Sequence, residues 1–133
     1  MKKLFAFLFT TLSFLTVYCG SWEIKFGHGG GFAGKETTFT LTKKGKLLKQ
    51  DNIAAPSVEI SKMKKSKAKK FLKEISTLDF KNIQLNEPGN MYHFITLVEN
   101  GKEYKSVWGS KSNNEKLDAF YEKLVALTKE NNN

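Results

Sequence analysis

The chain has 133 residues, with 22 basic and 13 acidic side chains and a formal net charge of +9. This length allows one domain with a modest core. All the basic residues are lysines. Because arginine is the preferred residue for bidentate contacts to phosphates and base edges, its absence argues against specific nucleic-acid binding.

Residues 1–18 have the pattern of a secretory signal peptide. Met1-Lys2-Lys3 is a short basic start, and the segment from Leu4 to Val17 is apolar apart from Ser and Thr. This order is typical of export signals, and the apolar stretch is short for a transmembrane helix, which needs about 20 residues. We therefore expect the segment to be removed on export. An uncleaved membrane anchor is the alternative interpretation.

The only cysteine, Cys19, lies directly after this segment. A lone cysteine in an exported chain has no internal disulfide partner, and its position suggests acylation, as in bacterial lipoproteins. The match to a lipobox is loose, because Tyr18 stands where a small residue is usual. We predict a lipid on Cys19 that anchors the protein to a membrane of the cell envelope. Ordinary cleavage near Ser21, giving a soluble secreted or periplasmic protein, is the alternative.

Three strands are predicted at the start of the mature chain. Residues 22–26 alternate apolar and charged side chains, which predicts a strand with one buried face. Residues 37–42 are rich in Thr and Phe and predict a second strand, and residues 47–49 come after a Lys-Gly turn as a short third one. Five glycines in residues 27–34 predict a loop between the first two strands.

This glycine-rich segment resembles two phosphate-binding motifs and fits neither. The span from Gly29 to Lys35 matches the first seven positions of the phosphate-loop pattern, but Glu36 stands where a Ser or Thr would bind Mg²⁺. Gly29, Gly31 and Gly34 also match the spacing of the dinucleotide fingerprint. Both motifs need a helix next, whose N-terminal amides hold the anion, and here a strand is predicted. We expect no nucleotide and no other cofactor.

The segment holds more glycine than a hairpin needs, which is typical of a backbone that approaches another surface closely. Its one large apolar side chain is Phe32. The candidate partner-binding loop consists of His28, Gly29, Gly30, Gly31, Phe32, Ala33 and Gly34. Burial of Phe32 in the protein's own core is the alternative.

A first helix is predicted after an irregular segment from Asp51 to Ile60, with Ser61 as its cap. Its apolar residues recur at helical spacing: Ala68, Phe71, Leu72, Ile75 and Leu78. Lysines cover much of its remaining surface. We expect a solvated face there, and contact with anionic lipid headgroups is the alternative.

The last third of the chain predicts a hairpin and a second helix. Asn100-Gly101 suits a type I′ turn between strands over residues 91–99 and 102–108, and this register places Glu99 opposite Lys102. Ser112 and Glu115 form a capping box before a second apolar stripe of Leu117, Phe120, Leu124 and Leu127. Residues 131–133 should fray.

The predicted order is therefore β-β-β-α-β-β-α. Antiparallel hairpins with both amphipathic helices on one face of the sheet make an α+β domain, which we place at residues 19–130.

From Trp22 onward the chain resembles emfourin, a family of small inhibitors of protealysin-like metalloproteases of the thermolysin group. The resemblance rests on Gly30-Gly31-Phe32-Ala33-Gly34, followed in order by Leu78-Asp79-Phe80, Pro88-Gly89-Asn90 with Tyr92, and the Asn100-Gly101 hairpin. It covers residues 22–128. It implies an α+β fold and an inhibitory loop that contacts a metalloprotease. Members of this family need not be exported, whereas this chain carries an export pattern.

No pattern in the sequence indicates an enzyme. His28 and His93 are the only histidines, and neither has a partner at metal-ligand spacing. No Ser has the setting of a nucleophile elbow, and the carboxylates form no evident acid–base pair. We expect a cell-envelope lipoprotein that binds a protein partner, with a secreted thermolysin-type metalloprotease as the candidate. The alternative is a non-inhibitory envelope lipoprotein that binds a small ligand or a structural partner.

Overall fold

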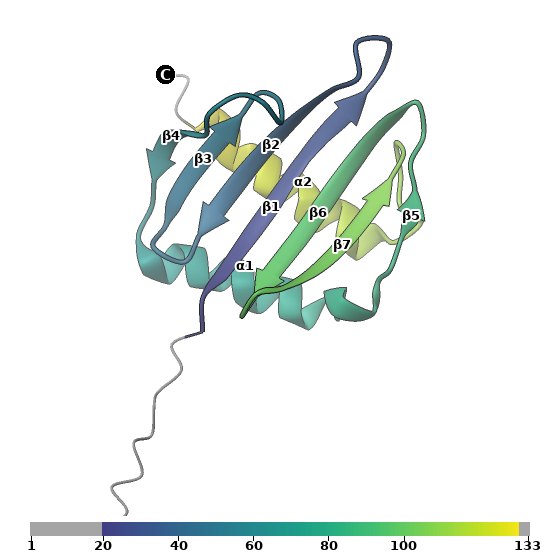
Figure 1. Ribbon diagram of the computed structural model, residues 1–133. Coiled ribbons are helices and arrows are strands. Elements are labelled where there is room, and N and C mark those ends of the chain that lie inside the picture. The colour runs from purple at the N-terminus through teal and green to yellow at the C-terminus, as the bar shows by residue number, and fades with distance from the viewer. Residues whose placement is uncertain (1–19, 131–133) are drawn as a thin grey trace, which may run out of the picture.

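The computed structural model describes residues 20–130, so the predicted signal segment, Cys19 and the predicted frayed tail lie outside the described residues. The fold is α+β, as predicted, with a seven-stranded sheet and two α-helices packed across one face of it (Figure 1). In chain order the elements are β1 (Trp22–Gly30), β2 (Lys35–Thr42), β3 (Lys46–Gln50), β4 (Val58–Lys62), α1 (Lys65–Thr77), the 3-10 helix η1 (Phe80–Asn82), β5 (Asn86–Glu87), β6 (Met91–Glu99), β7 (Lys102–Trp108) and α2 (Glu115–Lys129).

The sheet has the strand order β4-β3-β2-β1-β6-β7-β5, so the first strand of the chain lies at its centre. The prediction of a wholly antiparallel sheet is wrong in one place, because the two residues of β5 pair with β7 in parallel. The predicted element order also lacked β4 and β5. Both are short strands at the edges of the sheet, where a strand needs only one partner.

The segment expected to be irregular ends in β4, which pairs with β3 across a register shift between Leu47 and Leu48. Pro56 lies just before this strand, a position that needs no backbone donor. Ser61 is consequently a strand residue and does not cap α1. That helix begins at Lys65 after Lys64, which makes no side-chain capping bond.

The β6–β7 hairpin has the predicted register, with Glu99 opposite Lys102 and His93 opposite Trp108. Asn100 and Gly101 have φ values of 52° and 80°, as a type I′ turn requires. A local dipeptide therefore sets the alignment of two long strands.

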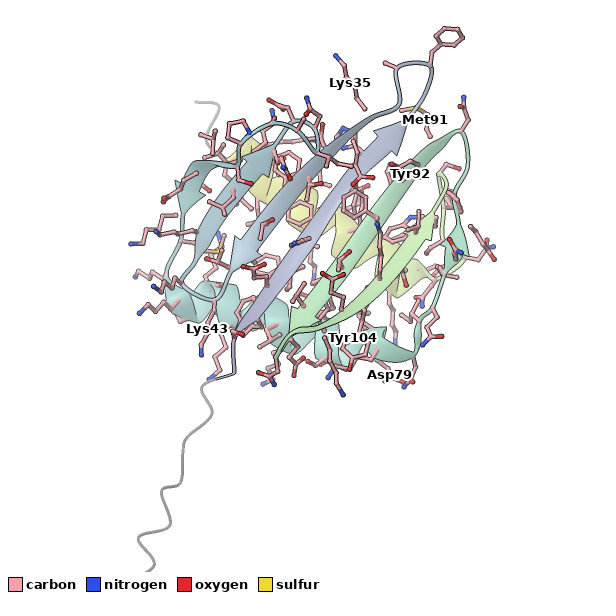
Figure 2. All side chains as sticks on the ribbon, viewed as in Figure 1. Lys35, Lys43, Asp79, Met91, Tyr92 and Tyr104 are labelled. Carbon is pink, nitrogen blue, oxygen red and sulfur yellow. The ribbon has the colours of Figure 1, made fainter. Side chains whose placement is uncertain are left out.

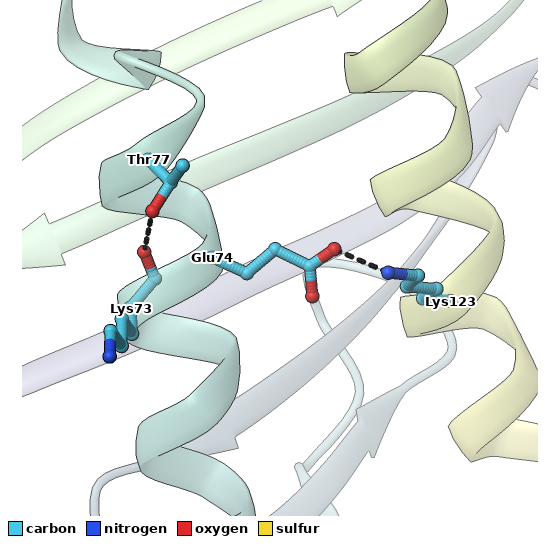
Figure 3. Close-up of polar contacts among 4 residues, drawn as sticks. All are labelled: Lys73, Glu74, Thr77 and Lys123. Carbon is cyan, nitrogen blue, oxygen red and sulfur yellow. Dashed lines mark hydrogen bonds and ion pairs between the residues drawn. The ribbon is translucent and has the colours of Figure 1, made fainter.

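The core lies between the sheet and the two helices. The four predicted apolar residues of α2 are buried, together with Ala68 and Ile75 of α1. The helices are joined by an ion pair in which Lys123 Nζ lies 2.6 Å from Glu74 Oε1 (Figure 3). Exposed pairs of this kind contribute below about 1 kcal/mol, so apolar packing holds the helices in place.

The predicted capping box of α2 is wrong by two residues. Asn114 is the N-cap, and its side-chain oxygen accepts a hydrogen bond from the Leu117 amide at 3.1 Å. The Ser112 hydroxyl oxygen instead accepts from the Asn114 amide, and the Ser112 amide donates to Asp118. Ser112 thus shapes the chain that leads into the helix.

Replacement of Gly101 by Ala tests the turn. The new side chain would meet no atom within 4 Å, so the cost comes from the positive φ alone, and we expect unfolding to become easier by about 1–2 kcal/mol. Gly109→Ala is the control, because Gly109 has no positive φ and its nearest neighbour lies 3.9 Å from the added carbon. Equal thermal stability of the two variants would contradict the turn assignment.

Candidate functional site

The glycine-rich segment is mostly strand, which corrects the predicted loop. His28, Gly29 and Gly30 belong to β1 and pair with β2 on one side and with β6 on the other. The turn itself is confined to residues 31–34. The next element after the turn is the strand β2, so no helix N-terminus is present at this segment to hold a phosphate.

Two glycines of β1 lie opposite aromatic rings of β6, and at Gly27 the backbone of β2 also excludes a side chain. Phe94 is opposite Gly27 and Tyr92 is opposite Gly29 across the β1–β6 pair. A Cβ added at Gly27 would lie 3.0 Å from the Phe94 ring and 1.9 Å from the Thr37 carbonyl oxygen, and one at Gly29 would lie 2.5 Å from the Tyr92 hydroxyl. The rings therefore lie on bare backbone, an arrangement in which an aromatic side chain covers a glycine on a neighbouring strand.

This aromatic cover lies outside the core formed with the helices. Phe94 is buried but does not belong to the main hydrophobic cluster. Side chains alternate between the two faces of a sheet, so Phe94 points away from the face to which its neighbours His93 and Ile95 point. The ammonium group of Lys105 lies 5.1 Å from the centre of the Phe94 ring. Phe94 is thus buried on the face of the sheet that the helices leave open.

Glu36 is part of the same arrangement. The Tyr92 hydroxyl donates a hydrogen bond to Glu36 Oε2 at 2.6 Å, across the glycine backbone of β1. This bond, together with burial and the negative charge, raises the pKa of Tyr92. The residue that departs from the phosphate-loop pattern therefore joins β2 to β6.

The tip of the β1–β2 hairpin projects beyond the neighbouring strands (Figure 1). The Gly31 amide donates to the Asn90 carbonyl at 2.8 Å, and the Gly34 amide donates to the Gly31 carbonyl at 3.2 Å. Phe32 is fully exposed at this tip, so the alternative that it belongs to the core is wrong. Met91, also exposed, lies near the base of the tip on the β6 side of the hairpin. Lys35 lies on the β2 side (Figure 2).

The two histidines lie opposite each other on β1 and β6. The His93 ring stacks on Tyr121 of α2 with ring centres 4.7 Å apart, and it meets Trp108 edge-on. The Tyr121 hydroxyl donates to the Gly27 carbonyl at 3.0 Å, and burial raises the pKa of Tyr121 to about 12. His93 is therefore a packing residue at the junction of sheet and helix, and His28 is exposed beside it.

Within residues 20–130, no three side chains of His, Cys, Asp or Glu lie close enough together to hold a metal ion. The described part of the chain also contains no helix that is long and apolar enough to cross a membrane.

Comparison with known proteins gives no assignment. No protein-family model matches the chain, and no curated protein matches its sequence.

The sequence reasoning missed Glu36, Met91 and Tyr92 as neighbours of the hairpin. A signal was present, because Gly27 and Gly29 are two residues apart and so are Tyr92 and Phe94. Pairing of those two segments in antiparallel register brings each ring over a glycine. The pairing itself joins strands far apart in the sequence, and no local pattern indicates it.

The free energy of unfolding should depend on the protonation of His93. Burial lowers its pKa from 6.5, the nearby His28 lowers it further, and Glu122 and Asp118 partly oppose this. The unfolded chain therefore binds the proton more readily than the folded one, so stability falls as pH decreases through about 6.5. In His93→Phe this component should disappear from denaturant titrations between about pH 8 and pH 5.

His28→Gln is the control for that measurement. Burial is the larger cause of the lowered pKa, so most of the pH dependence should remain in this variant. A wild-type protein whose stability has the same pH profile as His93→Phe would contradict the assignment.

Proposed function

We propose that this protein is a cell-envelope lipoprotein whose domain binds a protein partner through the tip of the β1–β2 hairpin. The observation that carries the proposal is the full exposure of Phe32 on a projecting turn. An aromatic ring held in water gains free energy when a partner buries it, and aromatic anchors often dominate protein interfaces.

The strands next to the tip hold it in a fixed conformation. It continues two strands at the centre of the sheet, and the Gly31–Asn90 hydrogen bond ties it to the start of β6. A segment that is already ordered loses little conformational entropy on binding. Its other residues, Gly31, Ala33 and Gly34, are small, so a partner can approach the backbone on both sides of the Phe32 ring.

A narrow, convex tip is suited to a concave partner surface, such as the substrate cleft of an enzyme. The resemblance of residues 30–34 to the emfourin family makes a secreted metalloprotease of the thermolysin type our candidate partner. In this proposal the tip enters the cleft and blocks it. A non-inhibitory partner that accepts the same tip is the alternative, and an assay of protease activity separates the two.

Membrane attachment through a lipid on Cys19 is the other part of the proposal. Gly20, the next residue, leads into β1 at the end of the sheet opposite the hairpin tip (Figure 1). A lipid there would leave Phe32 at the far end of the domain, free to meet a partner.

Phe32→Ala should separate binding from folding. Because the ring is fully exposed, its removal should leave the free energy of unfolding within about 0.5 kcal/mol of the wild-type value. Affinity for the partner should fall by about 30-fold, which corresponds to about 2 kcal/mol. Ile53→Ala, which truncates another exposed apolar side chain in the β3–β4 connection, should change neither quantity.

The measurement is a titration of thermolysin-type metalloproteases with wild-type protein, Phe32→Ala and Ile53→Ala, monitored by residual protease activity and by direct binding. Inhibition that is lost only in Phe32→Ala supports the proposal. Binding without inhibition would favour the non-inhibitory alternative. An unchanged affinity of Phe32→Ala would remove the tip from the interface.

Lipidation of Cys19 is tested on the protein expressed in a bacterial host that processes lipoproteins. We expect the mature chain to begin at Cys19 with a mass increased by acyl groups, and to incorporate a labelled fatty acid. Cys19→Ser should remove the label and release the protein from the membrane fraction. A soluble wild-type product that begins after Ser21 without added mass would contradict this part of the proposal.

A further inference from the structure

Lysines gather at the end of the domain where residue 20 leads into β1. Residues 42–50 and 60–73 contain eleven lysines and no acidic residue. Among the described residues, Lys67 and Lys49 are the members of this set that make ion pairs, with Glu130 and Asp51 respectively. Most of this charge is therefore not neutralised by carboxylates of the described chain.

Part of this charge forms a row along α1. Lys65, Lys69 and Lys73 are exposed and four residues apart, so they lie on one side of the helix over about 12 Å. This side faces away from α2, because Lys67, Phe71 and Glu74, which contact α2 or its C-terminal end, lie on the opposite side of the helix. Figure 3 shows Glu74 extending toward Lys123, whereas the Lys73 side chain points the other way.

A groove lies beside this row, with a volume of about 550 Å³. Lys65 and Lys69 line one side, Lys43 and Lys44 of the β2–β3 turn line the other, and the apolar side chains are Leu72 and Trp22. Lysine stems can lie along apolar surface while their ammonium groups extend beyond it. The groove thus presents cations around an apolar floor.

Gly20 also lines the groove, and its carbonyl accepts a hydrogen bond from Lys43 Nζ at 3.0 Å. The amide of Asn100 in the β6–β7 turn donates to the neighbouring Ser21 carbonyl at 3.0 Å. The chain is therefore held on both sides where it leads into β1, and Lys43 lies at this end of the sheet, opposite Lys35 and Met91 (Figure 2). Cys19 directly precedes Gly20 in the sequence.

We propose that the lysine groove, formed by Lys43, Lys44, Lys65 and Lys69 around Leu72 and Trp22, docks on an anionic phospholipid surface together with Lys73, the next lysine of the row on α1. The charge of the groove is complementary to phosphate headgroups, and its apolar floor suits the boundary between headgroups and acyl chains. A basic patch adds electrostatic attraction to anionic lipids, and this attraction would strengthen the attachment given by a lipid anchor. The significance of the groove's position beside Gly20 depends on the proposed lipid at Cys19. The charge and the shape of the groove favour membrane docking independently of that lipid.

The test uses a chain that begins at Gly20, which contains all the strands and helices of the described residues and has no lipid. Binding is measured by co-sedimentation with vesicles of phosphatidylcholine alone and of phosphatidylcholine mixed with phosphatidylglycerol. We expect binding to the mixed vesicles only, weakened by added salt because the Debye length shortens. Each lysine near an anionic bilayer contributes about fivefold to the partition coefficient.

The triple variant Lys65→Gln, Lys69→Gln, Lys73→Gln should therefore lose about 100-fold in partitioning. Gln and Lys have similar helix propensities, so thermal melts should show an intact fold. The matched control is Lys35→Gln, Lys111→Gln, Lys116→Gln, which removes three exposed lysines and the same net charge elsewhere.

The control variant should bind the mixed vesicles almost as well as the wild type. Equal losses of binding in the two triple variants would show that net charge alone is responsible and would overturn the proposal. The proposal would also be overturned if the wild-type protein did not bind the mixed vesicles. Equal binding to vesicles of phosphatidylcholine alone would overturn it too. These outcomes are independent of the acylation assay, so failure of the groove and failure of the lipid anchor are distinguishable.

Discussion

The pairing of β1 along both of its edges is the constraint on which the rest of the structure depends. The strand joins β2, β3 and β4 on one side to β6, β7 and β5 on the other. One of its faces supplies Trp22, Ile24 and Phe26 to the core, and its other face carries Gly27 and Gly29 beneath aromatic rings. Glycine in a strand costs about 0.5–1 kcal/mol relative to alanine. Here the cost is offset because the bare backbone lets Phe94 become buried without a helix above it.

Local signals in the sequence predicted the parts of the fold that depend on local chemistry. Asn100-Gly101 was sufficient to align β6 with β7, since the turn requires positive φ at both positions. The apolar stripes of α1 and α2 have helical periodicity and identify the buried faces. The edge strands could not be predicted in the same way. Two residues of β5 have no periodicity, and β4 depends on its partner β3.

The sequence drew attention to the glycine-rich segment as a candidate site, but it did not predict the geometry of that segment. Phe32 was identified as the one large apolar side chain among glycines, yet the sequence left its burial open. Exposure depends on how far the β1–β2 hairpin extends past the start of β6, and that is a property of the assembled sheet. Likewise the lysines of α1 were evident, but the groove forms only when the β2–β3 turn and Gly20 come beside the helix.

The position of β1 has a mechanical consequence. A membrane tether at Cys19 and a partner at Phe32 would hold opposite ends of this one strand, so a pulling force between them would run along its length. Its hydrogen bonds to β2 and β6 lie across that direction, because both neighbours are antiparallel to it. Because both points of attachment lie at the ends of β1, its extended covalent backbone would carry the tension, and the hydrogen bonds across the two strand pairs would bear little of it. With both attachments in place, the domain would transmit tension between a surface and a partner while it stays folded.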